Sequence, residues 1–152
     1  MIYTSSYDAC KNTLYATCSI SADRGKRKAY TGNYYRDLAP KKDFWIIWHD
    51  NIGKISEEEN NKFYIREYWS KVLSRLDAKK VYQDLDNCIL LCYEDNTKFC
   101  HRLIVAAWFE LLLGVTVDEV VSNGLMIEHV DKPLYNFIKA YLKELMHKDG
   151  VI

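Results

Sequence analysis

Hydrophobic residues recur at three- and four-residue intervals in three long segments of this chain, a pattern that predicts amphipathic helices. These segments cover residues 56–76, 99–112 and 134–145, and a shorter helix is expected over 77–85. Ser56 and Glu59 form a capping box at the start of the first helix, Asp77 can cap the short one, and Gly114 ends the helix over 99–112.

Shorter runs of β-branched and apolar residues predict strands over residues 1–4, 14–20, 87–93 and 115–117. The run Phe-Trp-Ile-Ile-Trp over 44–48 fits either a strand or a buried helical turn, because periodicity does not separate the two in short runs. Residues 21–43 are too polar, and too rich in Gly and Pro, for regular structure throughout. Long irregular connections of this kind are more often functional or mobile than inert.

Strands that alternate with amphipathic helices predict parallel pairing with right-handed crossovers. We therefore expect an α/β fold with a mainly parallel sheet flanked by helices, Rossmann-like and built as one domain over residues 1–152. In such sheets the strand ends that precede helices meet at one edge, which is where ligands bind.

The segment with the most chemistry lies between the strand over 87–93 and the helix over 99–112. It reads Cys-Tyr-Glu-(x)5-Cys-His-Arg. A helix start offers unpaired N–H groups and a partial positive charge, so it favours an anion. Arg102 adds a planar donor that matches phosphate or carboxylate, although an ion pair with Glu94 that fastens the loop is the structural alternative.

The candidate catalytic residues are Cys100, His101 and Glu94. A helix start with neighbouring cations favours the Cys100 thiolate and thus a nucleophile, whereas a packed thiol is the alternative. Consecutive helical residues point about 100° apart, so His101 need not serve Cys100 as a base. Glu94 fits a general acid or base if the pocket excludes water, and a paired carboxylate if Arg102 lies beside it.

Further ligand contacts are expected where other segments reach the same edge of the sheet. The expected ligand-binding set is Arg102, Ser5, Ser6, Tyr35, Lys41, Cys92 and Tyr93. Residues 24–42 interleave cations with aromatic rings, as a nucleotide or single-stranded nucleic-acid surface does. A solvated loop fits the same composition, and the net charge of zero favours it slightly.

The five cysteines are an odd set without a CxxC pair, which predicts free thiols in a reducing, cytoplasmic protein. Cys92, Glu94, Cys100 and His101 lack the tight knuckle of structural zinc sites, so the spacing predicts no metal site. No apolar run approaches the roughly 18 residues of a membrane span, and no membrane association is expected.

Three stretches together resemble the uncharacterised domain-of-unknown-function family number 488. They are the opening Ile-Tyr-Thr-Ser-Ser, the Tyr-x-Gly-x-x-Tyr-x-x-Leu-Ala-Pro-Lys-x-Asp-Phe segment over 30–44, and Leu-Leu-Cys-Tyr-Glu-(x)5-Cys-His-Arg over 90–102. The resemblance implies an α/β fold with a Cys-His-Arg pocket and supplies no established reaction. It covers a core of about residues 1–121, which leaves about 125–150 as an added C-terminal helical extension.

The sequence thus favours a protein that binds an anionic ligand, a nucleotide or another phosphorylated small molecule, at the Cys-His-Arg helix start, with enzymatic activity left open. One alternative is a non-catalytic nucleic-acid-binding module that uses residues 24–42. The other is a protein-interaction module in which the C-terminal helix forms a homo-oligomer or partner interface. No cofactor is indicated.

Overall fold

Seven strands form the sheet of this protein in the computed structural model, which describes residues 1–152. The strands are β1 (Tyr3–Ser6), β2 (Asn12–Thr13), β3 (Thr17–Ser19), β4 (Asn33–Tyr34), β5 (Ile89–Cys92), β6 (Asp118–Gly124) and β7 (Met126–His129). Their order is β2-β6-β1-β5-β3-β4, with β7 paired to β6. Every pair is parallel except β6 with β7. The predicted α/β fold with a mainly parallel sheet is confirmed.

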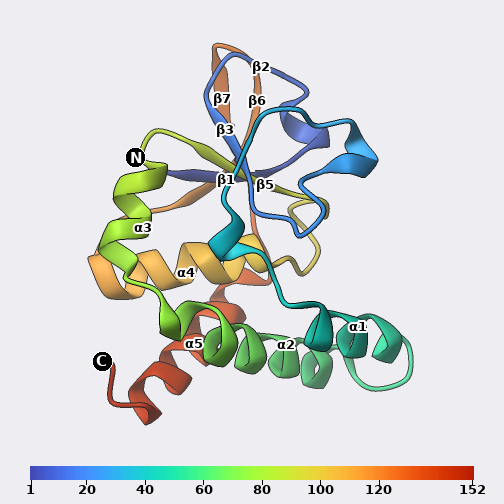
Figure 1. The fold of residues 1–152 in the computed structure, drawn as a ribbon, viewed down its shortest axis with the longest axis vertical. Helices are drawn as coiled ribbons and strands as arrows, with labels where there is room; N and C mark the ends of the chain where they lie inside the picture. The colour runs from blue at the N-terminus through green and yellow to red at the C-terminus, as the bar shows by residue number, and fades with distance from the viewer.

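Five α-helices gather on one side of this sheet (Figure 1). They are α1 (Lys42–Asn51), α2 (Glu57–Lys71), α3 (Ala78–Leu85), α4 (His101–Leu113) and α5 (Tyr135–Lys148). The main core contains Leu90 of β5, whereas its neighbours Ile89 and Leu91 belong to a small cluster with Tyr7. Because side chains alternate along a strand, one face packs on helices and the other is covered by connecting segments. None of the helices has the length and apolar character needed to cross a membrane.

The helix boundaries follow the capping signals in the sequence. The Ser56 hydroxyl accepts the Glu59 N–H at 3.1 Å, and Asp77 accepts the N–H groups of Lys79 and Lys80. Gly114 ends α4 with φ 67°, a left-handed conformation that suits glycine. The helix expected over 56–76 ends as α2 at residue 71 and continues into a short 3₁₀ turn.

The structure decides one segment that the sequence left open and differs from the expectation in another, because the strand expected over 115–117 begins only at Asp118. Residues 44–48, which the pattern left open, are helical and belong to α1. The segment after residue 117 forms the β6–β7 hairpin, so the extension expected over 125–150 begins as a strand and becomes helical only at Tyr135. The hairpin was missed because β6 opens with Asp118 and Glu119, a pair of charges that reads as a loop.

Glu119 lies in the sheet because it pairs with Arg102, a fully buried residue of α4. The guanidinium donates from Nε to Oε1 at 3.0 Å and from Nη2 to Oε2 at 2.6 Å. The Thr4 hydroxyl of β1 donates to Oε1 at 2.7 Å, and Arg102 Nη1 donates to Cys92 Sγ of β5 at 3.3 Å. One buried ion pair therefore connects α4 to three neighbouring strands.

Removal of one member of this pair should be strongly destabilising. In Glu119→Gln the Arg102 charge stays buried without its counterion, so we expect the free energy of unfolding to fall by about 3–5 kcal/mol. Glu58→Gln removes a carboxylate from an exposed pair with Lys62 and should cost less than about 1 kcal/mol. Urea unfolding of both variants tests this difference. Equal, small losses would show that the buried pair does not hold the sheet to α4.

Candidate functional site

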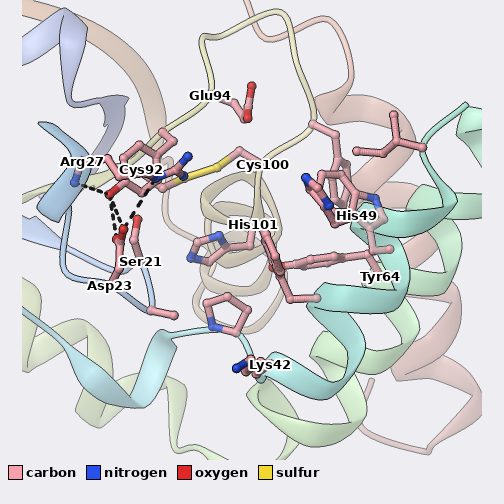
Figure 2. Close-up of a pocket in the computed structure, with 17 residues that line it drawn as sticks. Ser21, Asp23, Arg27, Lys42, His49, Tyr64, Cys92, Glu94, Cys100 and His101 are labelled. Atoms are coloured by element: carbon pink, nitrogen blue, oxygen red, sulfur yellow. Dashed lines mark hydrogen bonds and ion pairs between the residues drawn. A yellow bond between two sulfur atoms is a disulfide. The ribbon is translucent and has the colours of Figure 1, made fainter.

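A cavity of about 530 Å³ opens where β3 and β5 end, between the irregular connection, α1 and the start of α4 (Figure 2). The parallel register sets Ser19 of β3 beside Leu91 of β5, so the chain leaves both strands at the same edge. Ser21 and Cys92, the residues that follow or end these strands, both line the cavity. The site therefore lies at the carboxyl edge of the sheet, as expected of an open α/β fold.

Aromatic side chains form one wall of the cavity. Trp45, Trp48 and His49 line it from α1, and Tyr64 lines it from α2. Trp45 stacks on His49 with ring centroids 4.9 Å apart and an interplanar angle of 17°. Trp48 donates from Nε1 to Asn61 Oδ1 at 3.2 Å, which fixes its ring on α2. Trp45 remains 38% exposed, so its face is available to a ligand.

The irregular connection forms the opposite wall. Tyr93 donates its hydroxyl to both carboxylate oxygens of Asp23 at 2.7 Å, and the Arg27 guanidinium lies 4.2 Å from the centroid of the Tyr93 ring. Burial, and secondarily the Asp23 carboxylate, raise the pKa of Tyr93, so its hydroxyl stays protonated and keeps donating. These contacts fasten residues 21–27 against the end of β5.

Sulfur atoms and an imidazole form the floor. Cys92 ends β5 and Cys100 is the residue that precedes α4, and the two are joined by a disulfide at the centre of Figure 2. The expectation of five free thiols is thus wrong for this pair and holds for the other three cysteines. Cys92 and Cys100 meet because the loop after β5 turns back on itself, which the absence of a CxxC pair does not reveal. The ligand atoms of Cys92, Cys100 and His101 all lie within 4.8 Å of one another, so this cluster could hold a metal ion.

His101 is buried at the first position of α4, and its Nε2 lies 2.8 Å from the Ile20 carbonyl oxygen. A carbonyl only accepts, so Nε2 carries the proton and Nδ1 keeps the lone pair. Burial is the largest cause that lowers the pKa of His101 to about 4, and the nearby Arg102 charge acts in the same direction. At neutral pH the ring is therefore uncharged and acts as an acceptor or ligand at Nδ1.

Half of the residues predicted for the site line this cavity. They are Cys92, Tyr93, Glu94, Cys100 and His101. Glu94 lies half-buried on the loop after β5, above the disulfide in Figure 2. No side chain caps the first turn of α4, so its N–H groups remain directed toward the side that Cys100 occupies.

The other predicted residues do not line it. Arg102 lies beneath the floor and is held by Glu119, so the alternative pair with Glu94 is also not formed. Ser5 donates to the Val120 carbonyl at 2.6 Å, and the Ser6 hydroxyl accepts the Ala9 N–H at 3.2 Å. The remaining two residues sit elsewhere: Tyr35 donates to Asp84 at 2.7 Å, and Lys41 lines a second, neighbouring cavity.

Sequence reasoning missed the wall that α1 contributes. Trp45, Trp48, His49 and Ile52 all line the cavity and follow the i, i+3, i+4, i+7 spacing of one helix face. The sequence contains this spacing, but it spans residues 45–52 and is not visible within the shorter run 44–48. Arg27 and Lys42, two cations of the segment 24–42 that the sequence singled out, line the cavity as well.

The fold and site together define an α/β protein with a pocket at the carboxyl edge of a mainly parallel sheet. The chain matches the family DUF488-N3a, described as the active DUF488-N3 subclade, over residues 7–112. The protein belongs to this family, as the resemblance implied. No curated protein and no solved structure matches the chain.

The buried imidazole predicts a specific dependence of stability on pH. Unfolding restores the pKa of His101 from about 4 to its ordinary 6.5, so the unfolded state binds more protons between these values. The free energy of unfolding should therefore fall as the pH drops from 7 to 4, by about 3 kcal/mol from this residue. Urea unfolding in a chelating buffer measures the loss. His101→Gln should flatten this part of the profile and the exposed His147→Gln should not; identical profiles for wild type and His101→Gln would contradict the assignment.

Proposed function

We propose that this protein binds a nucleotide, or a related phosphorylated molecule with a flat ring, in the cavity at the start of α4. The observation that carries the proposal is the composition of one cavity: aromatic rings on one wall, cations at the rim and an uncapped helix start in the floor. Its volume of about 530 Å³ lies in the range of small-molecule sites.

The ring-binding half of the proposal rests on α1. Trp45 and His49 already stack on each other, and Trp45 keeps over a third of its surface exposed. A base or another planar group can extend this stack, because every base has a π-face and sequence-tolerant stacking contributes about 1–3 kcal/mol per base. Carboxylates of Asp23 and Glu94, which line the same cavity, can accept from exocyclic amino groups.

The anion-binding half rests on Arg27, Lys42 and α4. Both cations line the cavity, and the thirteen-residue helix α4 begins at its floor without a side-chain cap. The first-turn N–H groups and the helix dipole favour a phosphate or carboxylate there. Arg102 stabilises this arrangement from beneath rather than by contact, because its guanidinium is paired with Glu119. The cations of the proposed anion site are thus Arg27 and Lys42, whereas the sequence suggested Arg102.

A reaction at this site would use Glu94 or the Cys100 sulfur. Glu94 lines the cavity, so its carboxylate is within reach of a bound ligand as a general acid or base. Cys100 can act as a nucleophile only after its disulfide with Cys92 is reduced, since the thiolate is the reactive form. Binding and chemistry are therefore separable properties of the same cavity.

Removal of the exposed indole should weaken nucleotide binding. We expect Trp45→Ala to lose about 1–3 kcal/mol of binding free energy for nucleoside monophosphates, because the stacking surface disappears. Ile47→Ala is the matched control: Ile47 lies on the same helix, is 49% exposed and does not line the cavity. Isothermal titration calorimetry with nucleoside monophosphates, the matching nucleosides and inorganic phosphate separates ring from anion recognition. Absence of heat for all three ligands would refute the proposal.

A second cavity favours single-stranded nucleic acid as the alternative ligand. It has a volume of about 340 Å³, shares Ala22 and Pro40 with the first, and is lined by several cations. The cations are Arg36, Lys41, Lys71 and Arg75. Lys71 is occupied by Asp43 at 2.9 Å and by Glu67, whereas the other three make no ion pair in the structure. A strand whose base enters the aromatic cavity could lay its next phosphates along this basic surface.

Such binding should depend strongly on salt. For a short single-stranded oligonucleotide we expect the logarithm of the association constant to fall linearly with the logarithm of salt concentration. Arg36→Gln and Arg75→Gln should each reduce this slope by about 0.7 if each cation neutralises one phosphate. Lys143→Gln, an exposed change on α5, should leave the slope unchanged. Fluorescence anisotropy at several salt concentrations checks this, and equal slopes in all variants would exclude the second cavity as a phosphate track.

A further inference from the structure

Three potential metal ligands converge on the floor of the aromatic cavity. Cys92 at the end of β5, and Cys100 and His101 at the start of α4, are buried, line the cavity and hold their ligand atoms within 4.8 Å of one another. We propose that the reduced form of this cluster binds one divalent transition-metal ion of the zinc class, with a further coordination position open to the cavity. This goes beyond the proposed nucleotide binding and does not depend on it.

The two sulfur atoms suit such an ion. Zinc in proteins is tetrahedral with Zn–S bonds of about 2.3 Å, so two thiolates on one ion lie about 3.8 Å apart. The Cα atoms of Cys92 and Cys100 are 7.3 Å apart, which leaves room for an ion between the thiolates once the disulfide is opened. Two thiolates also cancel the two charges of the ion, so the buried cluster carries no net charge.

The imidazole is already held in the tautomer that a metal ion requires. His101 donates its Nε2 proton to the Ile20 carbonyl at 2.8 Å, which leaves the Nδ1 lone pair for the ion. Histidine ligands in metal sites almost always donate the other ring N–H to a carbonyl or carboxylate in this way, because the hydrogen bond fixes the ring and raises its basicity. The backbone after β3 therefore supplies the outer support of the site.

Arg102 supports the sulfur side. Its Nη1 donates to Cys92 Sγ at 3.3 Å, and its other donors are fixed on Glu119. A charge-assisted hydrogen bond stabilises a thiolate over a thiol, and the thiolate is the metal-binding form. The guanidinium cannot leave this position without breaking the buried ion pair. The Cys-His-Arg sequence thus has one role for each residue: two ligands and one fixed donor.

The open position faces the cavity and not the core. Three protein ligands with one exchangeable position are characteristic of catalytic zinc sites, whereas structural sites use four protein ligands. A water molecule at that position would ionise near neutral pH. The chemical class this arrangement serves is hydrolysis of a bond in a ligand held by the aromatic wall.

The sulfur atoms of Cys92 and Cys100 either form the disulfide or bind the metal ion, and the two states exclude each other. Opening the disulfide requires two electrons, which a phosphine reductant supplies, and two protons, which come from the water molecule that gives its oxygen atom to the phosphine. The two thiols then release both protons when the ion binds. Three other cysteines, Cys10, Cys18 and Cys88, are free and lie outside the cluster, so they report on thiol number without competing for the site.

The test uses the full chain produced with added zinc and purified with a phosphine reductant. Elemental analysis should find one zinc ion per chain, and replacement by cobalt should give the intense thiolate-to-cobalt absorption of a tetrahedral site. Cys92→Ser, Cys100→Ser and His101→Asn should each lower metal affinity at least tenfold. Cys88→Ser, at a half-buried free cysteine, should retain it.

Circular dichroism shows which variants are folded, and Arg102→Lys gives a fifth variant that keeps all three ligands and a positive charge. It should weaken metal binding with the ligands intact. The proposal is overturned if reduced, folded wild type with five titratable thiols binds no zinc or cobalt, or if the metal persists in Cys100→Ser. Nucleotide titrations in the presence of a chelator test the earlier proposal alone, so failure of one is distinguishable from failure of the other.

Discussion

A guanidinium with no access to water must have a counterion, and in this protein that requirement organises the fold. Arg102 on α4 finds its carboxylate on β6, seventeen residues further along the chain, and the same carboxylate accepts from β1. Because a buried unpaired charge is so costly, the helix start has one position relative to the sheet. The positions of Cys100 and His101 at the cavity floor are fixed as well, because they lie beside Arg102 at the start of a helix that cannot slide along the sheet.

The cavity above this floor is assembled from less constrained parts. One wall is the aromatic face of α1, and the other is the connection that Tyr93 fastens through Asp23. The two walls are continuous in the chain, because the connection runs through Pro40 directly into α1, and Pro40 and Lys42 both line the cavity. In the proposed function, ring stacking and anion contacts belong to these walls, whereas sulfur, imidazole and the helix dipole act from the floor.

The sequence predicted the parts of this structure that depend on local rules. Caps at Ser56 and Asp77, the end of α4 at Gly114 and the strand into Cys92 all follow from nearest neighbours, and parallel topology then placed Cys92, Glu94 and His101 at one edge. It failed where partners are distant. The sequence assigned Arg102 to a ligand, whereas its counterion is Glu119. Glu119 could not be recognised as that counterion because the charged start of β6 resembles a loop. The Cys92–Cys100 contact was missed because the loop after β5 turns back on itself, and the α1 wall was missed because its helical spacing extends beyond the short run 44–48.

The arrangement of the helices has a consequence for how this protein can diversify. With all five helices on one side, α1 lies at the end of the helical layer and packs on α2 (Figure 1). Its side chains Ile46 and Ile47 are exposed. If the pocket binds a ligand as proposed, substitutions along the cavity-facing side of α1 would change ligand selection and leave the sulfur-bearing floor and its buried counterion unaltered. Ligand choice would then be confined to a single ten-residue segment of the chain.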